Sequence, residues 1–364
     1  RREAMDDVLK IAKNCRHYAM CKIDFLGSGV CASGLEKHYV SFYPEGRMDL
    51  YAAIAENTIP ITEKCVEIAD SCNLCGKCDY QCYFVMELRP SKVMKALKDH
   101  VGAYLKSGGK IVQAKDDGLL AEMKGIVGDY WVTNDPAVRI TYHHDLCPHV
   151  TFKMPEYVVM PNSKEEISSI IKLLNKNKIP YVVRGNGASS HGLVFSEGVI
   201  LDLNRMKTMD FDEKNWSVKV GPGIAAFDLQ REAKKRGTRV HTAEPAALVC
   251  ANIMTSGLLS TFSTAYGVSA DNFIDAEFIA RDGSFFRLND ITAPNLFAFH
   301  NSNSEHEAFA ICVSVSMKLH PVTDDEAGIL VPFESLEQAL DFARECATRH
   351  IGLAIGTLGE EFVS

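Results

Sequence analysis

The stretch CNLCGKCDYQC constrains this chain more than any other, because it sets Cys72, Cys75, Cys78 and Cys82 at the spacing C-x2-C-x2-C-x3-C. This spacing winds three thiolates around one face of a four-iron cluster (4Fe–4S), and in proteins with two clusters the last cysteine serves the other cluster. Gly76 lets the backbone turn tightly among the ligands. Structural zinc sites instead favour C-x2-C pairs about a dozen or more residues apart. The motif therefore favours iron–sulfur over zinc or unliganded thiols.

The remaining composition limits what the chain can do. It holds 12 cysteines in 364 residues, and eight of them lie between Cys15 and Cys82. In a reducing compartment such a cluster indicates metal or cofactor ligation rather than disulfides. The net charge of −8 argues against nucleic acid or an anionic membrane as a partner. No apolar run approaches the roughly 20 residues of a membrane helix, and the N-terminal stretch lacks the apolar core of a signal peptide. We therefore expect a cytoplasmic protein with no membrane span.

Composition and periodicity divide the chain into the regions 1–108, 109–330 and 331–364. The first region is predicted to be mostly helical and ends near the Gly108-Gly109 pair. The second mixes strands, helices and glycine turns, which predicts an α+β domain, and Ser163 with Glu166 forms a capping box. The expected helices span 46–57, 60–72, 89–110, 225–237 and 334–352, and the expected strands include 198–206, 216–223 and 276–288.

Four stretches in the first region carry a family resemblance over about residues 12–105. CRHYAMC at 15–21, GVCASG at 29–34, YPEGRMDLYAAI at 43–54 and the cysteine motif resemble the iron–sulfur subunit of glycolate oxidase and its heterodisulfide-reductase-like relatives. The resemblance implies a ferredoxin-like domain with two cluster motifs. It departs from the family at Tyr83, where a proline is usual.

The first of those motifs is degraded. Tyr18 stands where its middle cysteine would be, between Cys15 and Cys21. By the ferredoxin pattern Cys31 completes the cluster of Cys72, Cys75 and Cys78, and Cys82 joins Cys15 and Cys21 at the first site. A three-iron cluster, or a four-iron cluster with a ligand such as Asp24, would fit that site; the alternative is that it is empty, so that one cluster forms instead of two. We expect Cys65 to be a core residue.

A second candidate site is the glycine-rich stretch IPYVVRGNGASSHG, residues 179–192. Its small residues let several backbone N–H groups converge on a diphosphate. The stretch lacks the G-x-G-x-x-G spacing and the strand-to-helix context of a Rossmann loop, so alone it also fits a plain surface turn.

Other stretches supply the context for this loop. Residues 158–192, the segments GVILDLNRM, VKVGPG, EPAALVCANIMTSG, AYGVSADNF and MKLHPV, and a lead-in at 126–145 resemble the FAD-binding domain of the vanillyl-alcohol-oxidase/p-cresol-methylhydroxylase superfamily, in the glycolate oxidase and D-lactate dehydrogenase branch. The resemblance covers about residues 118–335 and implies two α+β subdomains with FAD between them. The positions that match cofactor-binding segments are Arg184, Gly185, Asn186, Gly187, Ala188, Ser189, Ser190, His191, Gly192, Pro222, Gly223, Pro245, Ala246, Val249, Asn252, Thr255, Gly257, Tyr266, Gly267 and Ile311.

Two departures from this family bear on the cofactor. The usual position for a covalent flavin link is Ala188 here, which predicts noncovalent FAD, and His191 is expected to be structural. Met254-Thr255 stands in place of a usual Gly-Gly pair, and EAFAICVSV at 307–315 in place of Gly-Thr-x-Gly-Ile.

The resemblances imply oxidation of a 2-hydroxy acid to a 2-oxo acid, with electrons passing from FAD through one or two clusters to an external acceptor. An electron-transfer flavoprotein or another iron–sulfur or flavin subunit would be that redox partner. The alternatives are an electron-transfer subunit without a substrate of its own, or a structural module whose cofactor sites have decayed. Residues 331–364 resemble the start of a truncated or absent substrate cap domain, so no catalytic base is assigned. The polar candidates are His143, His144, His300 and His306.

Overall fold

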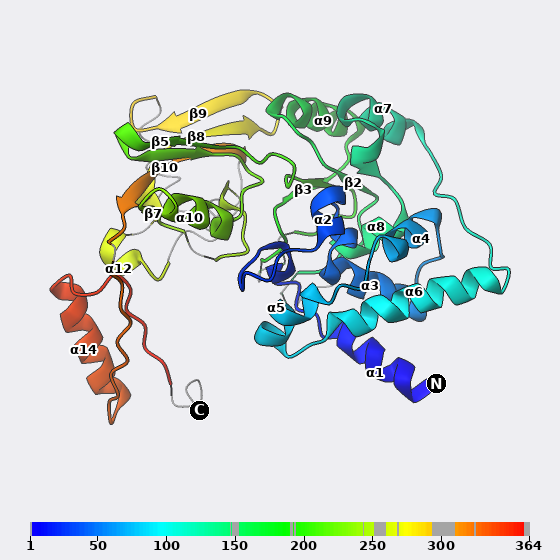
Figure 1. Ribbon diagram of the computed structural model, residues 1–364. Helices are drawn as coiled ribbons and strands as arrows, with labels where there is room; N and C mark the ends of the chain where they lie inside the picture. The colour runs from blue at the N-terminus through cyan, green and yellow to red at the C-terminus, as the bar shows by residue number, and fades with distance from the viewer. Residues whose placement is uncertain are drawn as a thin grey trace. The chain divides into compact units, whose positions relative to one another are not determined.

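The chain folds into two compact units, which are described separately (Figure 1). The structure is a computed structural model that describes residues 2–145, 147, 153–189, 192, 194–242, 244–250, 260–267, 269–292, 310–323 and 325–359. Unit 1 comprises Arg1–Met206 and Arg281–Ser284, and unit 2 comprises Lys207–Ala280 and Phe285–Ser364. The predicted boundary at residue 108 falls within unit 1, so the predicted domain limits stay predictions. Within the described ranges, no helix has the length and apolar character that a membrane span requires.

The N-terminal part of unit 1 is helical, blue to cyan in Figure 1. Its central helix is α3, which packs against α1 and α6. Helix α6 begins with a proline at its first turn and ends before Gly108, whose positive φ of 83° suits glycine. The helices here are α1 (Arg2–Lys13), α2 (Ala32–Lys37), α3 (Pro44–Ala55), α4 (Glu63–Asp70), α5 (Lys77–Met86), α6 (Pro90–Lys106), α7 (Gly118–Val127) and α8 (Pro136–Arg139), with 3-10 turns η1 (Met20–Lys22), η2 (Val40–Phe42), η3 (Asp129–Trp131) and η4 (Ile140–Tyr142).

A four-stranded sheet completes unit 1 in the order β1-β2-β4-β3. β2 and β3 both pair parallel to β4, and β1 is antiparallel to β2. Parallel strands need a crossover connection, and helix α9 (Lys164–Asn177) provides the one from β2 to β3, which lie on either side of β4. The predicted cap is confirmed, because the Ser163 side chain accepts a hydrogen bond from Glu166 N at 3.1 Å. The strands are β1 (Val132–Thr133), β2 (Tyr157–Val159), β3 (Tyr181–Arg184) and β4 (Val199–Asp202).

One hydrophobic core joins the helices of unit 1 to its sheet. Leu50 of α3 and Leu97 of α6 belong to the same buried cluster as Val158 of β2 and Ile200 of β4. The cysteine-rich segment and the start of the predicted FAD-binding region therefore fold as one packed body. Cys65 lies in this core fully buried, which confirms its prediction as a core residue.

Unit 2 is built on an antiparallel sheet with a separate core. Among the described residues it has six strands in the order β5-β6-β10-β8-β9, with β7 paired to the end of β10. Leu229 of α10 and Val315 of β10 lie in the core. The elements are β5 (Met209–Asp212), η5 (Glu213–Asn215), β6 (Ser217–Val220), α10 (Ala226–Lys234), β7 (Thr238–Val240), α12 (Ser263–Tyr266), η6 (Ser269–Asn272), β8 (Phe273–Ala280), β9 (Phe285–Asn289), β10 (Ala310–Pro321) and α14 (Leu336–Thr348).

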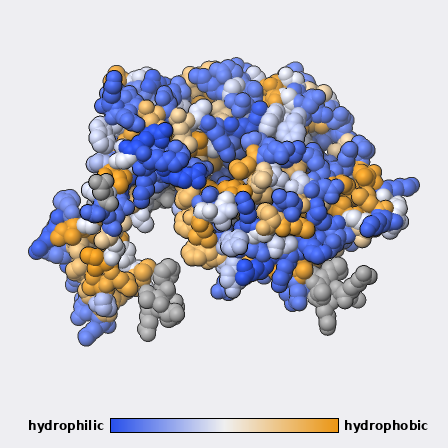
Figure 2. Space-filling view, viewed as in Figure 1, coloured by the Kyte–Doolittle hydropathy of each residue, from blue (hydrophilic) through white to orange (hydrophobic). Residues whose placement is uncertain are grey.

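Helix α14 confirms the predicted helix near residue 334, with Ser335 as its N-cap. Its apolar side chains are exposed: Leu336, Leu340 and Phe342 are 66%, 51% and 47% accessible. Figure 2 shows orange, apolar atoms on this segment. Contiguous apolar surface of this kind usually marks a contact face.

Candidate functional site

Four cysteines from two stretches of unit 1 line one cavity of about 530 Å³. Cys31 precedes α2, Cys72 follows α4, and Cys75 and Cys78 lie at the start of α5. The structure thus brings Cys31 to the same cavity as the first three cysteines of the strong motif. This is the grouping that the ferredoxin pattern implied.

The backbone between the end of α4 and the start of α5 makes tight turns beside the cavity. Leu74 and Gly76 both adopt positive φ, 57° and 76°, so the chain turns twice between the ends of α4 and α5. Such a conformation is costly for leucine and is retained where the surrounding structure demands it. Lys98 of α6 donates hydrogen bonds to the carbonyl oxygens of Ala69 and Cys72, which fixes the end of α4.

A buried arginine holds the Cys31 side of this cavity. Arg47, only 1% exposed, donates through Nη2 to the hydroxyls of Ser33 and Ser71 and through Nη1 to Cys31 Sγ at 3.5 Å. Although burial raises the pKa of Cys31, the Ser33 hydroxyl and the Arg47 charge lower it below its ordinary value. Burial, Asp79 and the neighbouring cysteines raise the pKa of Cys78 to about 12. A thiolate therefore forms more easily at Cys31 than at Cys78.

The other three predicted ligands form a second group within electrostatic reach of one another. Burial and Glu45 raise the pKa of Cys15 and Cys21, and each of these thiols also feels another cysteine: Cys82 acts on Cys15, and Cys15 acts on Cys21. Burial and Asp79 raise the pKa of Cys82 to about 11. Cys15 therefore interacts electrostatically with both Cys82 and Cys21, and the binding of a cluster by these three cysteines stays a prediction.

Two further residues, Asp24 and Tyr43, bear on this second group of cysteines. The Asp24 carboxylate, a candidate ligand from sequence, accepts a hydrogen bond from Gly29 N at 2.7 Å and so closes a local turn. The pKa of buried Tyr43 is raised by burial and by both Cys21 and Cys31. Tyr43 therefore interacts with one cysteine of each group, and Gly34 is glycine there because a Cβ would approach the Tyr43 ring to 2.4 Å.

Arg184, the last residue of β3, opens the glycine-rich loop and is 1% exposed. Its guanidinium carbon lies 4.8 Å from the centre of the Tyr142 ring, and the Tyr142 hydroxyl donates to Asp202 at 2.7 Å. A Cβ on Gly187, whose φ is +77°, would lie 2.2 Å from Arg184 Nη2. Gly187 therefore allows the loop to fold tightly over the arginine.

The hydrogen bonding of the Arg184 side chain bears on whether this loop could hold a diphosphate. Among the described residues, its Nε and Nη1 have no hydrogen-bond partner although they are buried. Unpaired buried N–H donors on a fixed cation are costly alone and suit an anionic group. At the far end of the loop, Gly192 N donates to the Asp145 carboxylate at 3.0 Å.

The remaining predicted cofactor positions belong to unit 2, where two of the segments lie side by side. Val249 N donates to Ile224 O at 2.8 Å, and Phe227 N donates to Pro245 O at 3.0 Å, so the chain after Pro222-Gly223 pairs with Pro245–Val249. Ala246 and Val249 are buried there. The rings of Tyr266 and His320 stack with centres 3.8 Å apart, next to Gly267, and Ile311 is buried on β10. The predicted positions Ser190, His191, Asn252, Thr255 and Gly257, the departure at Met254, and the candidates His300 and His306 lie outside the described residues.

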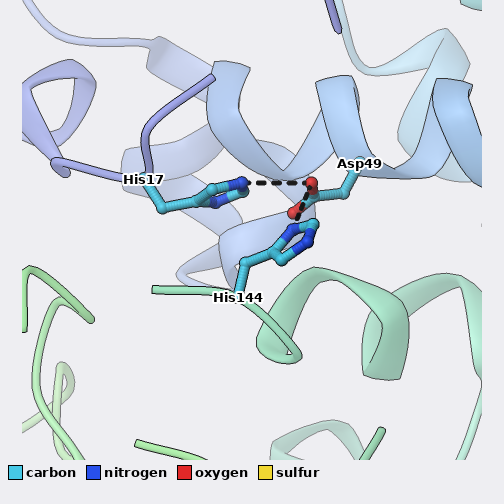
Figure 3. A group of neighbouring side chains, drawn as sticks. All are labelled: His17, Asp49 and His144. Atoms are coloured by element: carbon cyan, nitrogen blue, oxygen red, sulfur yellow. Dashed lines mark hydrogen bonds and ion pairs between the residues drawn. The ribbon is translucent and has the colours of Figure 1, made fainter. Parts of the chain in front are cut away.

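Sequence reasoning missed a buried polar group in unit 1, shown in Figure 3. Asp49 Oδ1 lies 3.3 Å from His17 Nε2 and 3.1 Å from His144 Nδ1. Burial lowers the pKa of His17, but Asp49 outweighs it and the net shift is upward. Burial raises the pKa of Asp49, but His17 and His144 bring it well below its usual range. His143 stacks on His144, and burial lowers its pKa to about 4. Only His143 and His144 stood out in the sequence.

The cysteine segment touches the glycine-rich loop through Lys22. Lys22 Nζ pairs with Glu45 at 2.8 Å and donates to Asn186 O at 3.2 Å, and both side chains of the pair are almost fully buried. The first cysteine segment thus rests against the loop that carries Arg184.

Comparison with known proteins finds similarity to FAD-binding proteins. Residues 155–289 match the family model described as FAD binding domain. The chain is 25% identical over 230 residues to an uncharacterized FAD-linked oxidoreductase of Mycobacterium tuberculosis, covering 61% of this chain and 50% of that protein. It is 24% identical to D-lactate dehydrogenase of Archaeoglobus fulgidus (54% and 46% covered) and 25% identical to glycolate oxidase subunit GlcD of Bacillus subtilis (56% and 45% covered).

One solved structure is similar in fold to this chain. Alkyldihydroxyacetonephosphate synthase matches with a TM-score of 0.51 at 18% identity, over 59% of this chain and 42% of that chain. The chain therefore carries an FAD-binding domain of α+β fold at residues 155–289, and Arg184 with Gly187 belongs to it. The chain spans about half the length of the curated relatives named above.

Proposed function

We propose that this protein is an FAD-dependent oxidoreductase that oxidises a 2-hydroxy acid to a 2-oxo acid and passes the electrons through iron–sulfur clusters to an external redox protein. The FAD-binding domain and the relatives named D-lactate dehydrogenase and glycolate oxidase support the flavin and substrate class. The observation that most supports the iron–sulfur part is a single cavity, in the same unit as the Arg184 loop, lined by Cys31, Cys72, Cys75 and Cys78.

The residues present fit both cofactors. Arg184 and the backbone of residues 185–192 would hold the FAD diphosphate without a covalent link, since Ala188 offers no attachment atom. The cavity cysteines would hold one four-iron cluster, and Cys15, Cys21 and Cys82 a second. When bound, FAD accepts a hydride and the clusters accept single electrons.

The chain's own contribution is to position these groups. Arg47 stabilises the Cys31 thiolate through a charged hydrogen bond. Lys22 holds the first cysteine segment on the carbonyl oxygen of Asn186, so the second group of cysteines lies next to the FAD loop. Because none of the 12 cysteines, all of them described, forms a disulfide, a reducing compartment such as the cytoplasm is part of the proposal.

Cofactor analysis tests this proposal directly. Protein prepared without oxygen should contain FAD and about eight irons per chain for two four-iron clusters, about seven for a three-iron plus a four-iron centre, or about four for one cluster. Cys31→Ser should lower the iron content, whereas Cys346→Ser on α14 is the matched control and should not. Zinc in place of iron, or equal iron in both variants, would overturn the cluster assignment.

Substrate reduction separates the dehydrogenase from the alternative, an electron-transfer subunit with no substrate of its own. D-lactate, glycolate or 2-hydroxyglutarate should bleach the flavin absorbance under anaerobic conditions. If no hydroxy acid bleaches it in the complete complex while a partner protein still reduces it, the electron-transfer role holds instead.

A further inference from the structure

We propose that His17, Asp49 and His144 form a binding site for one divalent transition-metal ion, distinct from the two cysteine groups. All three ligand atoms lie within 4.8 Å of one another (Figure 3). The three residues come from the first cysteine segment, from α3 and from the segment after η4. The site does not depend on the clusters proposed above.

The distances within the group match metal coordination. Nitrogen and oxygen ligands about 2.0–2.1 Å from a tetrahedral zinc ion lie about 3.3–3.4 Å apart. The two distances from Asp49 Oδ1 are 3.3 Å to His17 Nε2 and 3.1 Å to His144 Nδ1. Two of the three ligand pairs therefore already have the spacing of a tetrahedral ion, and the third pair, the two histidine nitrogens, lies within 4.8 Å and would adjust on binding.

Burial gives an independent reason to expect an ion. His17 and Asp49 are each only 5% exposed. If hydrogen bonds alone hold the group, Asp49 Oδ1 accepts both, and Asp49 Oδ2 and His17 Nδ1 remain buried without a partner among the described residues. An unsatisfied carboxylate oxygen in such a place is costly, and a bound cation compensates it.

The ligand chemistry selects the ion. Two imidazoles and one carboxylate form a set that zinc takes in sites with an open fourth position. The rings of His17 and His144 have centres 4.6 Å apart, so both imidazoles lie beside the same carboxylate. Asp49 and Glu45 add negative charge around His17, although Arg184 opposes it. Zn²⁺ is therefore the ion that we assign.

Such an ion would link the first cysteine segment to α3 and to the segment that contains His144. His17 lies between Cys15 and Cys21, and His144 directly precedes Asp145, which accepts the hydrogen bond from Gly192 N. A metal bound to both histidines and to Asp49 of α3 joins the three segments in the folded state only, so it stabilises that state.

The test uses the full-length, iron-loaded protein, so that the cysteines are already occupied. After incubation with Zn²⁺ and gel filtration, elemental analysis should show one more zinc per chain in the unchanged protein than in Asp49→Asn or His144→Gln. His350→Gln, an exposed histidine, is the matched control and should keep that zinc. Circular dichroism checks that each variant is folded, and His144→Gln alters the more exposed ligand in case Asp49→Asn unfolds.

Co²⁺ gives a second readout. Bound to two imidazoles and a carboxylate, it should show visible absorption bands without the thiolate charge-transfer band of a cysteine site, and Zn²⁺ should remove these bands and raise the Tm. Equal zinc in the unchanged protein and both ligand variants, or cobalt spectra with thiolate character only, would overturn the proposal and leave a hydrogen-bonded group.

Discussion

Lys22 Nζ donates a hydrogen bond to the carbonyl oxygen of Asn186, across 164 positions of sequence, at 3.2 Å. One residue follows the last cysteine of the first motif, and the other lies in the loop that begins with Arg184. The contact is buried, so it is a fixed part of unit 1. It makes the first cysteine segment and the loop that begins with Arg184 structurally dependent on each other.

Replacing Lys22 should therefore weaken the fold and flavin binding together. Lys22→Met leaves Glu45 buried without its cation, and breaking a buried ion pair by removing one partner costs about 3–5 kcal/mol. Urea unfolding should show this loss, and FAD titration a weaker affinity. Lys10→Met, whose pair with Asp7 is exposed, should change the free energy of unfolding by less than about 0.5 kcal/mol. Restoring stability with Lys22→Met plus Glu45→Gln would confirm the unpaired charge as the cause.

Gly187 should be intolerant of any side chain. Gly187→Ala combines a φ of +77° with a Cβ only 2.2 Å from Arg184 Nη2, so the loop must shift at a cost of about 1–3 kcal/mol. We expect FAD affinity to fall, measured by the fluorescence of released flavin. Gly102→Ala is the control, because that Cβ meets nothing within 4 Å in helix α6 and should stabilise by about 0.5–1 kcal/mol. Unchanged FAD affinity in Gly187→Ala would contradict the role of this loop.

Much of the fold could be predicted because its signals are local. The Ser163 cap and strand β4 follow from neighbouring residues, and the structure confirms them. The strong cysteine spacing also predicted a ligand group, and the structure places Cys31 with it. Iron binding itself stays a prediction.

Other parts of the site could not be predicted, since they join distant positions. His17, Asp49 and His144 meet only in the folded unit, and of the three only His144 was a candidate from the sequence. The sequence predicted only a helix at 46–57, whereas α3 is buried nearly all round, Arg47 and Asp49 included. The partners of Arg47 and Asp49 become visible only when α3 is seen packed against other segments of the folded unit.

Asp135 should make the protein less stable as the pH rises. Burial raises the pKa of this N-cap carboxyl above its ordinary value, although hydrogen bonds from Ala137 N and Thr62 lower it. A raised pKa means that the folded state prefers the neutral acid, so stability falls as the pH rises from the unfolded pKa to the folded one. Asp135→Asn keeps an acceptor oxygen without the charge.

The free energy of unfolding of Asp135→Asn should exceed that of the unchanged protein at pH 7. The difference should vanish below the ordinary aspartate pKa of about 3.9, where both side chains are neutral. Urea titrations at several pH values measure it. A constant difference across this range would show that the carboxyl charge is not responsible.

Arg47 should control the lability of the cluster that we propose at Cys31. Arg47→Lys keeps the positive charge but loses the planar fork that bonds Cys31, Ser33 and Ser71 at once, and each charged hydrogen bond contributes about 1.5–3 kcal/mol. We expect lower stability and faster loss of iron to a chelator, followed by absorbance. Arg344→Lys, exposed on α14, is the control and should release iron at the unchanged rate. If Arg47→Lys and Arg344→Lys release iron equally slowly, Arg47 serves only to pack α3 against α4.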